Sequence, residues 1–251
     1  MSAVKEVSGT LDSAIPRLSV VVPCFNESGR IGATLERLRD FFDGQSYGAE
    51  LIVVDDGSTD GTASVVAEGH PDVRLVRYGT NRGKGHAVKQ GMLEATGAYR
   101  LIYDADSSTP IEEVSKLWPR FDAGADCVIG SRTAPGAAIG AHQPRYREII
   151  GKLGNRFIRL AGLTTFTDTQ CGFKAFTAEA ARTIFARQVM ERFGADCEYL
   201  CIARVHGLTV AEVPVRWNNC PDTRVRPVRD SLRTLCEVLV IRANLWRRRY
   251  D

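Results

Sequence analysis

Residues 101–110 read LIYDADSSTP, an apolar run that ends in two aspartates one residue apart and is followed by a polar turn and a proline. Because residues i and i+2 of a strand project to the same side, a strand ending here would turn Asp104 and Asp106 toward one site. Paired carboxylates of this kind bind Mg²⁺ or Mn²⁺ and leave coordination positions open for a diphosphate. Taken alone, the stretch fits equally well a solvated turn in which Asp and Ser cap the next helix.

The pattern of a strand followed by a helix repeats along the first half of the chain. Apolar, β-branched runs predict strands at residues 18–23, 50–54, 73–76, 99–103 and 126–130. Helical spacing and helix-start signals predict a helix from near 28 to 42 and a short helix that follows the turn at 55–61 and ends at 69. Two more are predicted, one opened by residues 81–85 and running through 93, and one from 110 to 121. This alternation predicts an α/β fold, a single Rossmann-like domain with a mostly parallel central sheet and helices on both faces.

The second half of the chain is less regular. The spacing of apolar residues predicts helices at residues 146–160, 178–185, 196–205 and 232–246, and a strand at 209–217. Residues 133–144 are rich in Ala and Gly without periodicity, which predicts a mobile loop. Residues 1–16 are expected to form a flexible lead, and residues 17–251 a single domain.

Composition and charge exclude some classes of function. The formal net charge of +3 is too small to predict a nucleic-acid partner. From residue 221 onward, however, the chain has eight arginines and only four acidic residues, and this local excess of positive charge indicates an anionic partner or membrane surface. No apolar run approaches the roughly 18–20 residues of a membrane span, and no signal peptide is apparent. Seven cysteines without a C-x-x-C pair predict free, mostly buried thiols. We therefore expect a cytoplasmic protein that can contact the cytoplasmic face of a membrane.

Polar, glycine-rich turns follow strand after strand, and in open α/β sheets ligands bind at that carboxyl edge. We therefore expect Glu27, Asp56 and Lys84 to converge with the aspartate pair on one crevice. Lys84 at a helix start could meet a phosphate, and the two carboxylates could recognise a base and a ribose. Capping of turns and helices is the alternative for each. The P-loop spacing and the dinucleotide glycine fingerprint are both absent, which argues against a NAD-linked oxidoreductase.

Three segments of the second half carry further polar signals. Arg132 follows the predicted strand at 126–130 and could clamp an anion, or could be a surface cation. Residues 168–174 form a polar and then tightly turned segment for which a hairpin is the alternative. Residues 191–198 place carboxylates at a helix start, where interaction with the helix dipole is a sufficient explanation.

Four segments, residues 22–27, 53–60, 81–85 and 104–106, resemble in order the nucleotide-sugar half of family 2 glycosyltransferases. Later segments at 130–132, 168–174 and 191–193 are similar to the branch of that family that loads polyprenyl phosphates. Within that branch the dolichyl-phosphate β-glucosyltransferases are the nearest likeness, and the dolichyl-phosphate mannose synthases a more distant one. The resemblance spans roughly residues 18–245. It implies a GT-A fold with a nucleotide-sugar half at 17–131 and an acceptor half at 132–251.

The resemblance also implies roles for individual residues. The nucleotide sugar would be held by Pro23, Phe25, Glu27, Asp56, Lys84, Asp104, Ala105 and Asp106. Within that set, Asp104 and Asp106 would bind Mg²⁺ or Mn²⁺, with Asp106 the stronger ligand and a catalytic residue. The acceptor phosphate would be gripped by Arg132, Arg147 and Arg224. Asp196 falls where the family carries a catalytic base.

The implied reaction inverts the anomeric centre and moves a sugar, glucose from UDP-glucose in the first instance, onto a polyprenyl or dolichyl phosphate. One alternative keeps the fold and donor but uses a soluble hydroxyl acceptor, for which a carboxylate base is required. A remote alternative is a non-catalytic nucleotide-binding module. The basic, amphipathic helix predicted at 232–246 would bring the protein to an anionic membrane, or would simply pack on the core.

Overall fold

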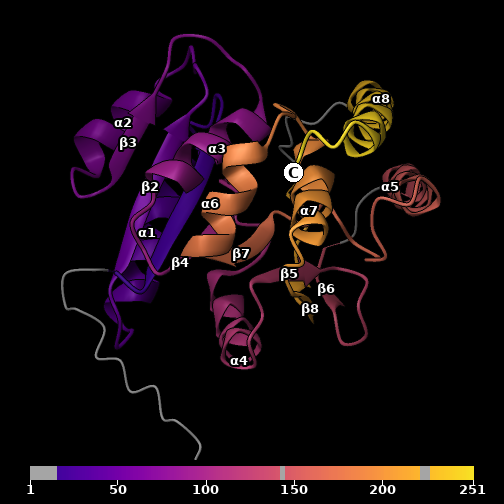
Figure 1. Ribbon diagram of the computed structural model, residues 1–251. Helices are drawn as coiled ribbons and strands as arrows, with labels where there is room; N and C mark the ends of the chain where they lie inside the picture. The colour runs from indigo at the N-terminus through magenta and orange to yellow at the C-terminus, as the bar shows by residue number, and fades with distance from the viewer. Residues whose placement is uncertain (1–15, 142–144, 221–226) are drawn as a thin grey trace, which may run out of the picture.

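A seven-stranded sheet forms the centre of the computed structural model, which describes residues 16–141, 145–220 and 227–251 (Figure 1). In spatial order its strands are β3 (Arg74–Arg77), β2 (Ala49–Asp55), β1 (Leu18–Cys24), β4 (Tyr99–Tyr103), β7 (Phe173–Thr177), β5 (Cys127–Ser131) and β8 (Val210–Pro214). All of them run parallel except β7, which is antiparallel to both of its neighbours. The predicted α/β fold with a mostly parallel sheet is therefore confirmed. The predicted lead at 1–16 lies almost wholly outside the described residues.

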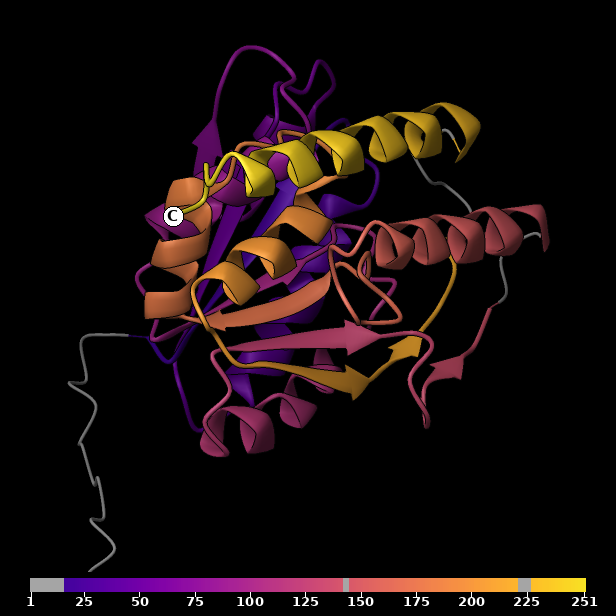
Figure 2. The same cartoon turned by 45° about the vertical axis from the view of Figure 1, so that its right-hand side comes forward.

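Helices cover both faces of this sheet. One face carries α1 (Ile31–Asp43), α2 (Thr62–Gly69), the 3₁₀ helix η1 (Ile111–Lys116) and α4 (Trp118–Asp122). The other carries α3 (Lys84–Glu94), α6 (Ala178–Arg187) and α7 (Ala195–Val205). The helix α8 (Pro227–Trp246) packs against α7, and α5 (Arg145–Leu160) runs beside α8 (Figure 2).

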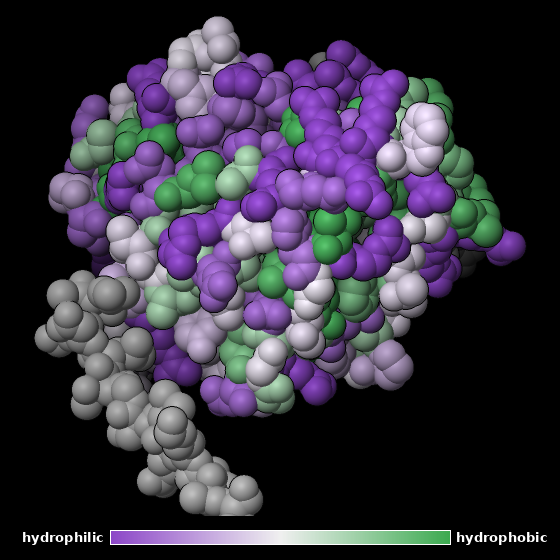
Figure 3. Space-filling model, viewed as in Figure 1, coloured by the Kyte–Doolittle hydropathy of each residue, from purple (hydrophilic) through white to green (hydrophobic). Residues whose placement is uncertain are grey.

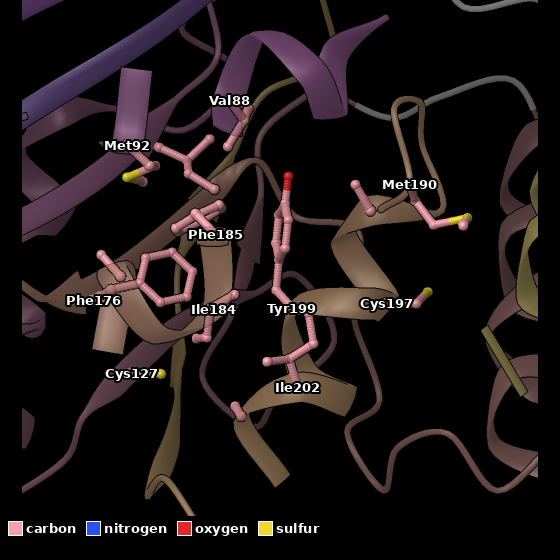
Figure 4. Close-up of a cluster of buried hydrophobic side chains, with 14 of the residues drawn as sticks. Val88, Met92, Cys127, Phe176, Ile184, Phe185, Met190, Cys197, Tyr199 and Ile202 are labelled. Carbon is pink, nitrogen blue, oxygen red and sulfur yellow. The ribbon is translucent and has the colours of Figure 1, made fainter. Parts of the chain in front are cut away.

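The central strands β1, β4 and β5 are buried on both faces, which explains their mainly apolar sequences. In β1, Val20 and Val22 pack under α1 while Val21, between them, packs under α3. Figure 4 shows the core on the α3 side, where Val88 of α3, Phe185 of α6 and Tyr199 of α7 belong to one buried cluster. Two hydrophobic cores thus fix the sheet and hold its carboxyl edge in place.

The antiparallel strand β7 is the main element that the sequence analysis missed. Its residues FKAFT are few, and a lysine interrupts the apolar run. The strand is placed by pairing with partners distant in sequence, Tyr103 opposite Phe173 and Ile129 opposite Lys174. Because β7 is antiparallel, its first residue lies at the edge where the parallel strands end. The turn at 168–172 therefore joins the other strand-end loops.

Several boundaries also differ from prediction, and α8, for example, begins at Pro227 instead of at residue 232. The helix predicted at 110–121 is split into η1 and α4, because Pro119 has no N–H to continue an α-helix from η1. The strand predicted at 209–217 divides into β8 and a short β9 (Arg216–Trp217). In the predicted mobile loop, β6 (Ala138–Ile139) pairs with β9, so part of that loop is ordered.

Candidate active site

Lys84 and Asp104 form an ion pair at the carboxyl edge of the sheet. Lys84 is the first residue of α3, and its Nζ lies 2.6 Å from Oδ1 of Asp104, just beyond β4. Burial alone would lower the pKa of Lys84, but the nearby carboxylates of Asp104, Asp196 and Asp106 outweigh it and raise that pKa. A lysine kept charged and three carboxylates therefore meet at one place. The contact between Lys84 and Asp104 is one that the strand-end rule predicts, whereas Asp196 comes from the start of α7 and was not part of that prediction.

The turn after β4 is fixed by contacts with Gly172 and Thr34. Asp104 packs so closely on Gly172 that a Cβ on that glycine would lie 1.7 Å from Oδ2 of Asp104. Ala105 is buried, and its carbonyl accepts a 2.8 Å hydrogen bond from the Thr34 hydroxyl. Ser107 has a φ of 51°, which reverses the chain sharply after Asp106. The two carboxylates are thus presented by a fixed turn.

These two carboxylates suit a Mg²⁺ or Mn²⁺ ion shared with a substrate. Oδ1 of Asp104 is engaged by Lys84, and Oδ1 of Asp106 accepts a 2.9 Å bond from the backbone N–H of Ser108. Among the described residues, no group of three or more His, Cys, Asp and Glu side chains could hold a metal by itself. One or two carboxylates completed by water and phosphate oxygens is the set that Mg²⁺ prefers in nucleotide sites. The residues present fit such an ion.

Asp56, at the end of β2, organises the segment that leads into α3. Its carboxylate accepts hydrogen bonds from the Asn81 side chain at 2.8 Å and from the backbone N–H groups of Arg82 and Gly83 at 2.8 and 2.7 Å. Asp56 is buried, so these bonds satisfy it. Asp56 therefore fixes the approach to Lys84, and its predicted contact with a nucleoside stays a prediction.

The loop after β1 carries the remaining predicted donor residues. Pro23 lies within β1, while Phe25, just after that strand, is 37% exposed. Glu27 forms an ion pair with Arg30 at 2.5 Å, and its backbone N–H donates to the Thr62 hydroxyl at 2.8 Å. The loop is thereby tied to the one after β2. The structure places these residues beside Asp56, and their roles stay predictions.

Arg132 follows β5 and is gripped by Asp168. Its Nε and Nη2 donate to the two oxygens of that carboxylate at 2.7 and 2.8 Å, and its backbone N–H donates at 2.9 Å. Burial would raise the pKa of Asp168, but the guanidinium overrides burial and lowers it. The Arg132 side chain also lies over the Trp217 ring, 5.5 Å from its centroid. Arg132 is thus held rigidly, with a quarter of its side chain exposed.

Asp196, in the first turn of α7, is paired with a buried lysine. Nζ of Lys174 donates to Oδ1 of Asp196 at 2.5 Å and to the carbonyl of Cys171 at 2.6 Å. Lys174 is fully buried and Asp196 is 6% exposed. One oxygen of the predicted base is therefore already occupied by an ammonium group, which orients the carboxylate.

Two predicted acceptor residues cannot be placed. Arg147 lies in α5, but its side chain is not among those described, and Arg224 lies outside the described residues. Conversely, sequence reasoning assigned no role to Lys174 or Asp168. The one available signal for Lys174 was the alternation of side chains between the two faces of a strand. In FKAFT, a lysine two residues before Phe176 shares its face, and that face is core.

Comparison with known proteins finds relatives that match most of this chain. The family model described as Glycosyl transferase family 2 matches residues 19–185. A dolichyl-phosphate beta-glucosyltransferase of Trichomonas vaginalis is 36% identical over 242 residues, 90% of this chain and 72% of that protein. The dolichyl-phosphate beta-glucosyltransferases of Saccharomyces cerevisiae and Homo sapiens are each 32% identical over 250 residues. These matches cover 90% and 92% of this chain, and 74% and 76% of the relatives.

Among solved structures, glucosyl-3-phosphoglycerate synthase from Mycobacterium tuberculosis has a similar fold. Its complex with Mn²⁺, UDP-glucose and phosphoglyceric acid gives a TM-score of 0.67 at 20% identity, covering 91% of this chain and 80% of that one. At that identity the likeness shows the fold alone, which is the GT-A fold. With the family match over residues 19–185, it follows that this chain belongs to glycosyl transferase family 2 and is an enzyme.

Proposed function

We propose that this enzyme transfers glucose from UDP-glucose to a dolichyl or polyprenyl phosphate with inversion at the anomeric carbon. The observation that carries the proposal is the position of Asp104 between two cations. Its Oδ1 pairs with Lys84 at 2.6 Å, and its carboxylate also packs against Gly172, in the turn that carries Asp168, the partner of Arg132, so the predicted donor and acceptor sides adjoin. The names of the relatives support glucose and dolichyl phosphate.

In the proposed reaction the chain's own residues bind and orient both substrates. Lys84, together with Asp104 and Asp106, holds the diphosphate end of the donor. A divalent ion bound by the two aspartates would offset the charge that develops on the leaving diphosphate. Arg132 meets the acceptor phosphate through Nη1, because Nε and Nη2 are committed to Asp168. The acceptor oxygen then attacks the face of the sugar opposite to the diphosphate.

The nature of the acceptor decides what Asp196 does. A phosphate monoester is already anionic near pH 7, so it needs cations to hold it rather than a base. A hydroxyl acceptor would instead require a carboxylate with a free oxygen. Lys174 engages only Oδ1 of Asp196, so this contact is compatible with either acceptor, and the preference for a phosphate acceptor rests on the names of the relatives.

Paired variants distinguish the two acceptors. With a short polyprenyl phosphate, Asp196→Asn is expected to reduce kcat/KM by less than about tenfold, because no base is needed and the amide keeps an oxygen for Lys174. Arg132→Ala is expected to cost about 10²-fold, since it removes a charged phosphate contact. The measurement is glycolipid formation by mass spectrometry over a panel of nucleotide sugars.

Contrary results point to specific alternatives. A loss of about 10²–10⁴-fold for Asp196→Asn with little loss for Arg132→Ala would favour a hydroxyl acceptor. Donor hydrolysis without any glycolipid would also favour that reading. Binding of UDP and Mn²⁺ without turnover of any donor would instead identify a nucleotide-binding module.

The adjacent helices α5 and α8 support contact with a membrane. Exposed apolar residues recur at intervals of seven on each helix, which is two turns, so each set lies on one face: Tyr146, Leu153 and Leu160 on α5, and Leu232, Leu239 and Trp246 on α8. Trp246 is 84% exposed. Figure 3 shows hydrophobic residues gathered along the edge where these helices lie.

Charge identifies the partner of this apolar face. Exposed arginines accompany it on and after α8: Arg229, Arg233, Arg242, Arg247, Arg248 and Arg249. No described helix has the apolar stretch that a membrane span requires. An apolar face bordered by arginines fits the interface of an anionic bilayer, where the apolar side chains enter the acyl boundary and the cations meet the headgroups. We propose peripheral binding there.

Vesicle sedimentation tests this surface. The wild-type protein is expected to bind vesicles containing anionic lipid and to be released by salt. Leu239→Ser combined with Trp246→Ser is expected to weaken vesicle binding at least tenfold, because two apolar side chains that would enter the bilayer are lost. Leu93→Ser, which changes an exposed leucine on α3, is the matched control. Equal binding by both variants, or binding independent of lipid charge, would contradict the proposed surface.

A further inference from the structure

Residues 188–194, between α6 and α7, form a strap that lies directly against the start of α3. The backbone N–H of His86 donates to the carbonyl of Glu191 at 2.9 Å. The Gln188 side chain donates to the carbonyl of Gly85 at 2.8 Å, and Lys89 donates to the carbonyl of Gln188 at 2.8 Å. These bonds join segments about a hundred residues apart, and all of them reach the turn of α3 that follows Lys84.

The strap leaves no space between itself and α3. A Cβ on Gly83 would lie 2.6 Å from the carbonyl oxygen of Glu191, and one on Gly85 would lie 2.7 Å from the carbonyl oxygen of Arg192. These two glycines flank Lys84. The strap also carries Met190 into the core beneath it, where Figure 4 shows its side chain near that of Cys197. The position of the first turn of α3 therefore depends on the position of the strap.

Both ends of the strap are held from α8 and the residues after it. At one end, the backbone N–H of Gly194 donates to Oε2 of Glu237 on α8 at 2.7 Å. At the other end, the N–H groups of Val189 and Met190 donate to the carboxylate of Glu198 at 2.8–3.1 Å. That carboxylate in turn accepts a 2.7 Å bond from the hydroxyl of Tyr250, four residues beyond α8.

The Tyr250 hydroxyl belongs to a buried polar network. Glu198 and Tyr250 are nearly inaccessible to solvent, and Asn244 of α8 donates to the same hydroxyl at 3.2 Å. His206 contacts the carbonyl of Tyr250 at 2.7 Å. A fully satisfied buried network of this kind is rigid, since each lost bond leaves a desolvated group behind. The chain end is thereby locked to the strap.

We infer that Glu237 and Tyr250 are positioning residues, through which α8 holds the strap against α3 and so sets the place of Lys84 beside Asp104. This inference rests on the proposed function for the role of Lys84 in binding the donor. It gives α8 two tasks, since its outer face carries the apolar residues and its inner face fixes the donor site. A shift of α8 on the membrane would be passed to the start of α3 through the bond from Gly194 to Glu237 and the bond from His86 to Glu191.

The first test measures the strap itself. Glu237→Met removes the acceptor for Gly194, and Tyr250→Phe removes only a hydroxyl. Both are expected to speed amide hydrogen exchange across residues 81–88 at least tenfold, because the strap that protects His86 is loosened. Glu237→Gln keeps an oxygen for Gly194 and should exchange like wild type. Glu36→Met, on the exposed face of α1, is the control. Unchanged exchange in both variants would overturn the inference, whatever the protein binds.

The second test links the strap to Lys84 by a double-mutant cycle on UDP binding with Mn²⁺. Glu237→Met is expected to weaken UDP binding about tenfold in the wild-type background but less than twofold in a Lys84→Met background. In turnover the KM for the donor should rise while the KM for the acceptor stays constant. Equal losses in both backgrounds would overturn the positioning role. Absence of UDP binding by the wild-type protein, with exchange still faster in the variants, would instead overturn the proposed function.

Discussion

Replacing Asp106 by asparagine is expected to lower kcat for sugar transfer on the order of 10³-fold, the largest loss for any single change at the site. Asparagine keeps the shape of the side chain and an oxygen to accept from Ser108, so the turn is preserved. It removes the charge that a divalent ion needs. Asp104 cannot substitute, because its Oδ1 is engaged by Lys84 at 2.6 Å.

The measurement is initial rate against Mn²⁺ concentration, with Mn²⁺ binding followed by calorimetry in the presence of UDP. The variant is expected to need far more Mn²⁺ and to reach a lower maximal rate. Asp122→Asn, on the exposed side of α4, has the same change of charge and should behave like wild type. Activity of Asp106→Asn within tenfold of wild type at the same Mn²⁺ concentration would contradict the assignment.

Replacing Lys174 by methionine is expected to destabilise the protein by about 3–5 kcal/mol. The ammonium is fully buried and bonds both Asp196 and the carbonyl of Cys171. Without it, a carboxylate remains that water hardly reaches. The free energy of unfolding is obtained from urea titration of the purified variant.

A surface pair gives the contrasting case. Arg74 and Glu94 are each about half exposed, so Arg74→Met is expected to change stability by less than about 1 kcal/mol. Lys174→Met combined with Asp196→Leu should recover part of the loss, since the unpaired charge is removed as well. Wild-type stability of Lys174→Met would show that the pair does not carry the predicted energy.

Much of the fold was predictable because the central strands are buried on both faces. Continuous apolar runs mark β1, β2 and β4 without reference to the rest of the chain, and polar turns mark their ends. The strand β7 was not predictable in this way. Its lysine breaks the apolar run, and only pairing with β4 and β5, which lie far away in sequence, makes it a strand.

The site divides in the same manner. Lys84 and Asp104 could be expected to meet, because both follow parallel strands and such ends share one edge. The partners of Arg132 and Asp196 could not be predicted, because Asp168 and Lys174 are brought to the site by the antiparallel strand β7 and the turn before it. Their burial is tolerated only through pairs that form across the sheet, and no local pattern encodes those pairs.

The position of β7 between β4 and β5 also constrains how the chain can be made. During synthesis the first half emerges from the ribosome with the edge of β4 unpaired, and some 70 residues pass before its partner appears. An uncovered apolar edge strand is a template for association with other chains. Loop closure over that distance also slows the pairing. The nascent first half is therefore the stage at which this protein is most exposed to aggregation. The sheet is completed only when β7, the strand that contains Lys174, has been synthesised.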